Sequence, residues 1–518
     1  MVTAELKSSY NVVVCGAGTS GSVLARRLAE NPDLEVLLLE AGGTDEVDSV
    51  MEASQWPLNL GSERDWGFAA EPDPQLYGRS IPFSMGKVLG GGSSINVMIW
   101  ARGHRSDWDY FASESGEPAW GYEPVLDLYR SLEDWHGTGE PDHRGMGGPI
   151  IVQPAPGVHP MAPSVLDAAR AIGIPTYQSP NGRLMEGLRG AAISDLRWRD
   201  DKRLSVYRTY TVPYLDKPNL TVLPHALVTR VTFDGNRASG VDVQYGGTIH
   251  HVAADVEVVL SLGAIHTPKV LMQSGVGDED ELRRAGVSVR QHLPGVGRNF
   301  QDHFGFDCVW EFPEKVQGSL QVGATIFWDS GAADADGPDL FACFGAFAKA
   351  TPENAAKYGL PQNSWTLFGA PTHAKSRGRL RLSGPGPADP IRIEANALSH
   401  PDDVKAAIAC VETLREIGNS ALLRPFVARE VMPGDLSGVD LETYLRNAVT
   451  TYWHESGTAK MGRDEMSVVD GRLKVYGVEN LRVADASIMP RITTANTMAP
   501  CVVIGERAAR FLEAEHRM

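Results

Sequence analysis

The first forty residues alternate between unbroken hydrophobic runs and a helical repeat of apolar positions. Residues 10–15 read YNVVVC, a short valine-rich run typical of a strand buried on both faces. After the turn GAGTSG at 16–21, the apolar side chains of Val23, Leu24 and Leu28 recur at helical spacing. A second hydrophobic run, EVLLLEAGG at 35–43, predicts the next strand. This order of strand, turn, helix and strand predicts a Rossmann-like α/β unit.

Two further kinds of pattern follow in the rest of the chain. From residue 220 to residue 265, segments rich in strand-forming residues are separated by the turns DGN and YGG, and a helix-like run, TPKVLMQSG, comes next. Alternation at 377–398 predicts paired strands, and periodicity at 401–417 predicts a helix. We therefore expect a second, α+β region in which an antiparallel sheet is backed by helices.

Composition and charge narrow the class of function. The chain has 518 residues, too many for one ordinary core, so two or more domains are expected. Its 48 Lys and Arg against 65 Asp and Glu give a net charge of -17, which disfavours nucleic acid and anionic membranes as partners. No hydrophobic stretch approaches the ~18 residues of a membrane span, and MVTAELKSSY lacks the apolar core of a signal peptide. These features predict a cytoplasmic protein that acts on a small molecule.

Cysteine and histidine spacing argues against a metal centre. The cysteines at 15, 308, 343, 410 and 501 form no close pair, which disfavours structural zinc and a dithiol redox centre. The segment HESGT at 454–458 begins like a zinc-protease helix, but Thr458 occupies the position of the second histidine ligand. We therefore predict no metal site, and His454 requires another explanation.

The glycine turn at 16–21 has the form of a dinucleotide-binding loop. Gly16 permits the tight turn, Gly18 lets the backbone approach a pyrophosphate, and Gly21 lets helix and strand pack closely. Glu40 follows Gly21 by 19 residues, close to the ~20 expected of an acid that binds the ribose hydroxyls. This acid disfavours NADP, whereas NAD and FAD both remain compatible with the motif.

A second glycine-rich segment follows at 85–103, MGKVLGGGSSINVMIWARG. Gly90, Gly91 and Gly92 precede Ser93, Ser94 and Asn96, so that successive backbone N–H groups and hydroxyl donors are available to a long ligand. The flanking apolar residues would hold this loop against a core. We interpret it as a second contact to the cofactor rather than as a flexible surface loop.

Several blocks together resemble those of the glucose-methanol-choline (GMC) oxidoreductases, which are FAD-dependent alcohol oxidases and dehydrogenases. They are GAGTSG with Glu40, GKVLGGGSSIN, SLGAIHTPKVLMQSGVG, LPGVGRNFQDH, YWHESGTAKMG, LRVADASIMP and TTANTMAPCVVIGE. The resemblance extends over nearly the whole chain and implies FAD as the cofactor. It also implies an FAD-binding domain made from residues 1–155, 205–306 and 452–518, and a substrate-binding domain made from residues 156–204 and 307–451.

The resemblance further implies a catalytic pair. His454 matches the family's histidine beside the reactive flavin nitrogen, and Asn496 matches its second polar residue. A neutral imidazole, with an ordinary pKa of ~6.5, is suited to accept the hydroxyl proton while the flavin takes the hydride. The amide of Asn496 could donate to the substrate oxygen and hold the alcohol in place.

The predicted cofactor contacts come from segments that are far apart in the sequence. They are Gly16, Gly18, Thr19, Ser20, Gly21, Glu40, Ala41, Gly91, Ser93, Asn96, Val97, Val228, Asp485, Ala486, Asn496 and Thr497. By resemblance, Val228 would lie near the adenine, and Asp485 and Ala486 near the flavin chain. Some members of the family carry a histidine that bonds FAD covalently just before the Asn of GGxSSxN. Ile95 stands at that position here, so we predict a non-covalent FAD.

The implied reaction is the oxidation of an alcohol CH–OH group to a carbonyl, with the electron acceptor left open. We favour molecular oxygen, and hence an oxidase, because nothing in the sequence suggests a membrane surface for quinone delivery. The alternatives are a dehydrogenase with another acceptor, a hydroxynitrile-type lyase with a structural FAD, and an NAD-dependent dehydrogenase that uses only the first motif. We expect a small primary or cyclic secondary alcohol as substrate. Aromatic residues that could line its pocket, or belong to the core, are Phe341, Phe344, Phe347, Trp365 and Phe368.

Overall fold

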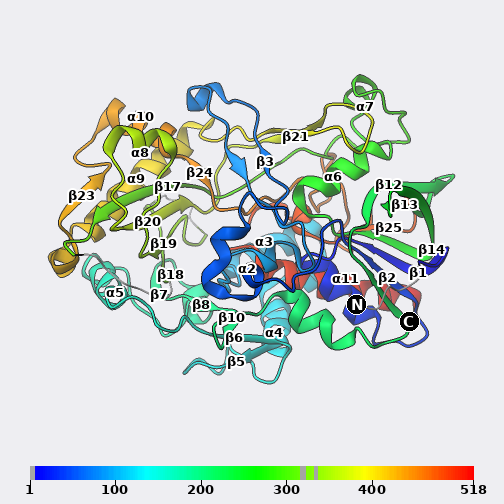
Figure 1. The fold of residues 1–518 in the computed structure, drawn as a ribbon, viewed down its shortest axis with the longest axis horizontal. Helices are drawn as coiled ribbons and strands as arrows, with labels where there is room; N and C mark the ends of the chain where they lie inside the picture. Colours follow the sequence, from blue (N-terminus) through cyan, green and yellow to red (C-terminus); the bar gives the residue numbers. More distant parts are fainter. Residues whose placement is uncertain (1–5, 315–321, 332–335, 518) are drawn as a thin grey trace.

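Two large sheets lie at opposite ends of the molecule, and the remaining elements connect them (Figure 1). The structure is a computed structural model that describes residues 6–314, 322–331 and 336–517. The N- and C-terminal ends both lie beside the first sheet. Within the described residues, no helix has the length and apolar character needed to cross a membrane.

The first sheet contains the predicted Rossmann-like unit. Its strand order is β11 (Leu220–Leu223), β2 (Val36–Leu39), β1 (Ser9–Cys15), β14 (Thr248–Leu260), β13 (Arg237–Tyr245) and β12 (Leu227–Asp234), and β25 (Leu481–Val483) also pairs with β14. The pairs among β11, β2, β1, β14 and β25 are parallel, whereas β12, β13 and β14 form an antiparallel meander. The long strand β14 belongs to both parts. The sheet thus joins segments from the start, the middle and the end of the chain.

Helix α1 (Thr19–Leu28) packs against the C-terminal helix α11 (Met498–His516). The apolar repeat marks this helix only from residue 22, whereas the helix begins at Thr19, within the glycine turn. The helix therefore starts directly after β1, and its first backbone N–H groups lie at the carboxyl end of that strand.

The second sheet is antiparallel and is backed by helices, as expected, but its strands are not those that the alternation at 377–398 predicts. Its order is β23 (Arg429–Met432), β17 (Phe304–Glu311), β20 (Ser364–Pro371), β19 (Leu340–Gly345), β18 (Val322–Trp328) and β7 (Gly190–Ile193), with β24 (Thr450–Thr451) paired to β17. Helix α9 (Pro401–Gly418) crosses the central strands, and α5 (Ala162–Ala171) and α10 (Gly438–Ala448) lie near it. Trp310 and Trp365 stack with ring centroids 4.4 Å apart in the core of this end.

The predicted paired strands at 377–398 form a hairpin of β21 (Arg379–Leu382) and β22 (Ile391–Glu394). This hairpin is separate from the second sheet and packs against α6 (Gly263–Gln273) and α7 (Glu279–Arg284). The later part of α6 corresponds to the predicted helix-like run, TPKVLMQSG at 267–275, and the helix begins four residues earlier, at Gly263.

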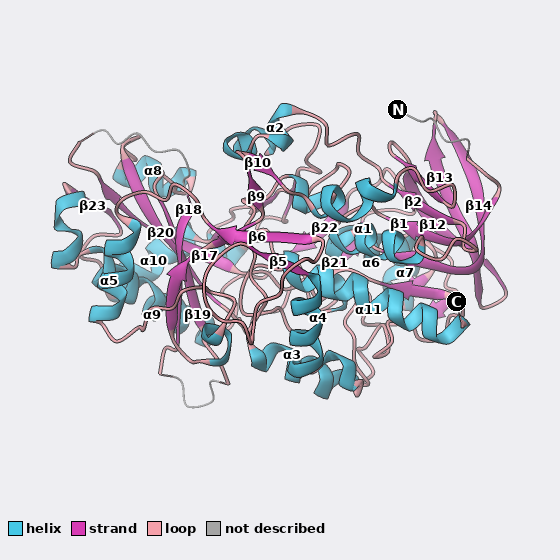
Figure 2. Ribbon diagram, turned by 90° about the horizontal axis from the view of Figure 1, so that it is seen from below, coloured by secondary structure: helices cyan, strands magenta, loops and turns pink. Residues whose placement is uncertain are grey.

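Shorter elements fill the space between the sheets and cover their edges (Figure 2). They are α2 (Asp48–Met51), β3 (Phe68–Ala69), β4 (Pro82–Phe83), α3 (Arg105–Ser115), α4 (Tyr122–Leu132), β5 (Glu133–Trp135), β6 (Ile150–Pro154), β8 (Asp195–Leu196), β9 (Trp198–Arg199), β10 (Lys202–Arg203), β15 (Val276–Gly277), β16 (Gln291–His292) and α8 (Pro352–Tyr358).

Candidate active site

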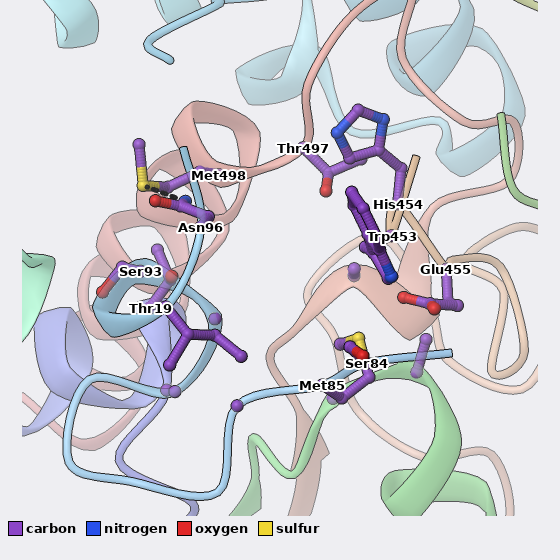
Figure 3. A pocket seen from close by; sticks show the side chains of 18 of the residues that line it. Thr19, Ser84, Met85, Ser93, Asn96, Trp453, His454, Glu455, Thr497 and Met498 are labelled. Atoms are coloured by element: carbon purple, nitrogen blue, oxygen red, sulfur yellow. Dashed lines mark hydrogen bonds between the residues drawn. The ribbon is translucent and has the colours of Figure 1, made fainter. Parts of the chain in front are cut away.

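A long cavity is bordered by residues of both sheets and of the C-terminal segment. It runs from the glycine turn after β1, past Ser93 and Asn96, to His454 and the strands β19 and β20. Figure 3 shows Thr19 and Ser93 on one side of this cavity, and Trp453, His454 and Glu455 on the other. The predicted residues that line it are Gly16, Gly18, Thr19, Ser20, Glu40, Ala41, Gly91, Ser93, Asn96, Val97, Val228, His454, Asp485, Ala486, Asn496 and Thr497.

Gly21 is the predicted cofactor residue that does not line the cavity, and its surroundings explain why. A Cβ atom at Gly21 would lie 1.9 Å from the carbonyl oxygen of Gly16, so the absence of a side chain permits close packing of α1 on the turn. A Cβ atom at Gly18 would meet no protein atom within 4 Å. The two glycines therefore have different roles. Gly21 allows helix α1 to pack against the turn, and Gly18 leaves room in the cavity.

The start of helix α1 offers unsatisfied hydrogen-bond donors to the cavity. Gly18 is its N-cap residue and supplies no side-chain cap, and Thr19 and Ser20 line the cavity. Backbone N–H groups at the first turn of a helix, together with the helix dipole, form an anion-binding site. This end of the cavity is suited to a phosphate.

Glu40 lies at the end of β2, beside the same turn. Its carboxyl oxygens accept hydrogen bonds from the backbone N–H groups of Ala17, at 3.1 Å, and Gly42, at 2.8 Å. Burial raises the pKa of this carboxyl to about 7. Because Glu40 also lines the cavity, it is placed to accept hydrogen bonds from hydroxyl groups of a ligand.

The second glycine loop touches the first. A Cβ atom at Gly91, which has a φ of 53°, would lie 2.8 Å from the Cα atom of Gly18. The hydroxyls predicted to serve a ligand are used within the loop, because Ser93 donates to the carbonyl of Gly90 and Ser94 to that of Leu89. The loop therefore contributes close backbone contact more than free hydroxyl donors.

Asp485 is also engaged by the protein. Its carboxylate accepts hydrogen bonds from the backbone N–H groups of Gly263 and Ser487 and from the hydroxyl of Thr267. These bonds tie the end of β25 to the start of α6. Asp485 therefore shapes the wall of the cavity, which it lines together with Ala486.

His454 lies at the centre of a chain of side-chain hydrogen bonds. Its Nδ1 atom lies 2.9 Å from Nδ1 of His303, and its Nε2 atom lies 3.1 Å from Nδ2 of Asn496. The backbone N–H of His454 donates to Asp302 at 2.9 Å. The two residues predicted as a catalytic pair are thus in direct contact.

The hydrogen-bond partners determine which nitrogen of His454 carries the proton. Nε2 of His303 lies 3.0 Å from the carbonyl oxygen of Thr372, which can only accept, so this nitrogen carries the hydrogen. Burial lowers the pKa of His303 well below its ordinary value, so the ring is neutral and its Nδ1 accepts from Nδ1–H of His454. Nε2 of His454 therefore carries no hydrogen, and its lone pair accepts a hydrogen bond from the Asn496 amide.

Burial also keeps His454 unprotonated. The pKa of its imidazole is lowered to about 3 because the ring is removed from water. At neutral pH the side chain is therefore in the form that accepts a proton. The next residue, Glu455, is buried with both carboxyl oxygens unpartnered among the described residues, and burial followed by the charge of Asp302 raises its pKa well above the usual range.

Family models match most of this chain. The N-terminal GMC oxidoreductase model matches residues 10–305, and the C-terminal GMC oxidoreductase model matches residues 374–505. The chain is a GMC oxidoreductase. It is accordingly an FAD-dependent enzyme, and the family resemblance drawn from its sequence blocks is confirmed.

Individual relatives of this GMC oxidoreductase match it over nearly their whole length. It is 35% identical to the mitochondrial choline dehydrogenase of Mus musculus, with 98% of this chain and 90% of the relative covered. It is 34% identical to the oxygen-dependent choline dehydrogenase of Escherichia coli O127:H6, with 98% and 96% covered. The crystal structure of pyridoxine 4-oxidase from Mesorbium loti superposes with a TM-score of 0.92 at 30% identity, covering 98% of this chain and 99% of that one.

The structure adds site residues that sequence reasoning did not assign. His303 ends the block LPGVGRNFQDH, but nothing in that block indicates that its ring meets His454, 151 positions later. Glu455 stands within HESGT, yet its burial cannot be read from the motif. A polar residue in each block was the available signal, and only the folded chain shows which of these residues are buried together in one site.

The aromatic residues considered for the substrate pocket divide into two groups. Phe344, Phe347 and Phe368 line the cavity. Trp365 lies in the core, because alternate residues of β20 point to opposite faces and its neighbour Thr366 faces the cavity. Phe341 packs against His303 and Tyr452, with ring centroids 4.9 Å from each, and supports the site from behind.

The GMC oxidoreductase also holds a buried cation beside the predicted cofactor loop. Arg203 is 1% exposed, and its guanidinium donates to Oδ1 of Asn96 at 3.0 Å. Burial, followed by repulsion from Arg197, lowers the pKa of Arg203 to about 9, and no carboxylate forms an ion pair with it among the described residues. A buried cation without a counter-ion suits an anionic ligand nearby. Arg203 does not line the cavity itself but lies behind Asn96, which does, so its charge can act on the pyrophosphate of FAD from behind this loop.

Proposed function

We propose that this GMC oxidoreductase oxidises an alcohol CH–OH group to a carbonyl, with His454 as the general base and Asn496 as the group that holds the alcohol. The observation that carries this proposal is the 3.1 Å contact between Nε2 of His454 and Nδ2 of Asn496, in the cavity that the glycine loops also line. The similarity to choline dehydrogenases and to a pyridoxine 4-oxidase supports an alcohol as the substrate class.

The two side chains can act on one hydroxyl group in complementary ways. A hydroxyl that enters between them accepts a hydrogen bond from Nδ2 of Asn496 and donates its own to Nε2 of His454. As the proton moves to Nε2, the developing alkoxide keeps the amide donor, and the hydrogen bond that Nδ1–H of His454 donates to His303 holds the imidazole ring in place. FAD, when bound, supplies the acceptor for the hydride that leaves the same carbon.

We propose further that FAD is bound without a covalent link and that molecular oxygen reoxidises it. Ile95 lines the cavity and has no atom that could form such a link. The name of the Escherichia coli relative includes oxygen dependence, which supports an oxidase over a dehydrogenase. We assign residues 1–155, 205–306 and 452–518 to the FAD-binding part and 156–204 and 307–451 to the substrate-binding part. A cytoplasmic location stays a prediction from the sequence.

An anaerobic titration tests the redox proposal. The purified holoenzyme is mixed with primary and cyclic alcohols, sugars, choline and pyridine methanols, and the flavin absorbance is followed before and after air is admitted. We expect one class of alcohol to bleach the flavin and air to restore it rapidly. Slow recovery would contradict the choice of oxygen. A flavin that no alcohol bleaches would contradict the oxidation and favour the lyase alternative.

A pair of histidine variants tests the role of His454. His454→Ala should slow flavin reduction at least ~10²-fold while the protein retains its FAD. His159 provides a matched control, because it is also 6% exposed but does not line the cavity. His159→Ala should reduce its flavin at the wild-type rate. Similar rates in both variants would remove His454 from the mechanism.

A further inference from the structure

The cavity wall opposite the glycine loops is formed by the second sheet. Cys343 and Gly345 of β19, together with Thr366 and Phe368 of β20, line the cavity. The chain leaving β19 adds Lys349 to this wall. Helix α9 covers the strands from the other side, so this face of the sheet is directed at the ligand space.

Lys349 presents a cation to the cavity and keeps its carboxylate partner behind it. Its ammonium lies 2.9 Å from Oδ1 of Asp307 and 3.3 Å from the ring centroid of Phe368. The lysine side chain is 22% exposed and lines the cavity, whereas the carboxylate is 1% exposed and does not line it. The N–H donors that Asp307 does not use are therefore available to a ligand.

The other charged groups of the cavity do not offset this cation. The carboxyl groups that line it are those of Glu40, Glu455 and Asp485. Glu40 and Asp485 accept backbone hydrogen bonds at the cofactor end, and the raised pKa of Glu455 favours its neutral form. Among the described residues that line the cavity, only Lys349 carries an ammonium or guanidinium group. The substrate side therefore offers the ammonium of Lys349, which Asp307 pairs from behind, and no ionised carboxylate among the described residues that line the cavity.

A path of aromatic rings connects this lysine to the catalytic pair. The ring of Phe368 stacks on that of Tyr452 with centroids 4.0 Å apart, and Tyr452 stacks beside His454 at 5.6 Å. The ammonium of Lys349 lies over the ring of Phe368. A planar substrate whose alcohol meets His454 could lie along these rings with its far end at Lys349.

We propose that Lys349, backed by Asp307, forms an anion-binding subsite that selects alcohols with a carboxylate at the end remote from the reacting carbon. This inference rests on the proposed alcohol oxidation and specifies its substrate class. A trimethylammonium group would meet the lysine ammonium, while the carboxylate of Asp307 lies behind that ammonium and does not line the cavity, so quaternary ammonium alcohols are disfavoured. The enzyme thereby differs in specificity from a choline dehydrogenase despite the similarity of sequence.

Three matched alcohols test the selection during turnover. They are 4-(hydroxymethyl)benzoate, 4-methylbenzyl alcohol and (4-hydroxymethylphenyl)trimethylammonium, which differ in the charge of the group opposite the alcohol. We expect the carboxylate to reduce the flavin with a kcat/KM at least ~10-fold above that of the methyl compound, and the ammonium compound to react most slowly. Lys349→Met should lower the value for the carboxylate about 10-fold or more relative to that of the methyl compound, so that the preference for the carboxylate is lost.

Lys357→Met is the matched control. Lys357 is an exposed lysine of α8 that also lies over an aromatic ring, that of Tyr358, and it does not line the cavity. This variant should keep the wild-type order of the three alcohols. Equal kcat/KM values for the carboxylate and the ammonium compound in the wild-type protein, or an unchanged preference in Lys349→Met, would overturn the subsite.

A binding measurement separates the subsite from the proposed oxidation. 4-Methylbenzoate has no alcohol group, so its binding to the holoenzyme can be followed by the change in flavin absorbance without turnover. We expect a Kd at least ~10-fold weaker in Lys349→Met than in the wild-type protein and in Lys357→Met. Such binding without bleaching by any of the alcohols would refute the oxidation and retain the subsite. If the neutral alcohol bleaches the flavin but Lys349→Met binds 4-methylbenzoate as tightly as the wild-type protein, the subsite is refuted and the oxidation is retained.

Discussion

Nδ1 of His303 and Nδ1 of His454 lie 2.9 Å apart, and this contact determines the chemistry available at the cavity. Since His303 must donate through Nε2 to the carbonyl of Thr372, it can only accept from His454. The lone pair of His454 is consequently directed at Asn496 and the cavity. His303 is thus a positioning residue that acts through His454.

Replacing His303 should separate catalysis from binding. In His303→Leu, the acceptor for Nδ1–H is lost and the two tautomers of His454 compete, so we expect kcat to fall at least ~10-fold with little change in KM. His303→Asn places a carbonyl oxygen near the lost nitrogen and should recover part of kcat. Both variants are to be compared in steady-state assays after their melting temperatures confirm folding. Equal losses in the two variants would contradict the role assigned to this ring.

Asn496→Asp should make the activity sensitive to acid. A carboxylate at this position would accept from Nε2–H of His454 and raise the imidazole pKa, which burial holds at about 3, by roughly 1 to 3 units. Because only the neutral imidazole accepts a proton, activity is lost as the pH falls through the raised pKa. We expect an acid limb between about pH 4 and 6 in the pH profile of flavin reduction.

Asn496→Ala is the control for this shift. It should lower the rate, because the substrate oxygen loses its donor, but it should leave the acid limb where the wild-type protein has it. An acid limb at the same pH in the Asp and Ala variants would show that the pKa of His454 does not govern the profile.

Two glycines of the first loop should respond differently to the same substitution. Gly18→Ala adds a methyl group that meets no protein atom and has a φ of -68°, which alanine adopts readily, so we expect a folded protein with FAD affinity at least ~10-fold weaker. Gly21→Ala places its methyl group 1.9 Å from the Gly16 carbonyl oxygen and should destabilise the fold by about 2 to 3 kcal/mol. Thermal melts of the apo forms and FAD titrations distinguish the two effects. A normal melting temperature for Gly21→Ala would show that α1 can shift.

Removing the buried charge of Arg203 should affect the FAD complex more than the apo protein. Arg203→Met eliminates a cation that is 1% exposed and has no carboxylate partner among the described residues, so the apo protein should melt at or above the wild-type temperature. The increase in melting temperature produced by added FAD should become smaller, because the diphosphate loses a counter-charge. An apo form that melts well below the wild-type protein would indicate that the packing of Arg203 matters more than its charge.

Local patterns were sufficient for the elements of the fold and for the identity of the cofactor loop. The valine-rich run before GAGTSG forms β1, and the periodic run at 401–417 forms α9, because burial of an apolar stripe dictates these spacings. Alternation correctly paired β21 with β22 but could not show that this hairpin packs against α6 instead of joining the second sheet. The distinction depends on surfaces that only a folded chain presents.

The sequence by itself predicted the glycine turns and Glu40 from residue types and spacing, and it predicted His454 and Asn496 from the resemblance of their blocks to those of the family. Only the tertiary structure shows that the ring of His303 contacts that of His454. It also shows that Gly21 packs closely against Gly16 whereas Gly18 leaves room in the cavity, and that Lys349 lines the cavity while Asp307 lies behind it. The physical reason is that proton positions and charge effects depend on distances of a few ångströms and on exclusion of water. Those quantities arise only when segments far apart in the chain pack together.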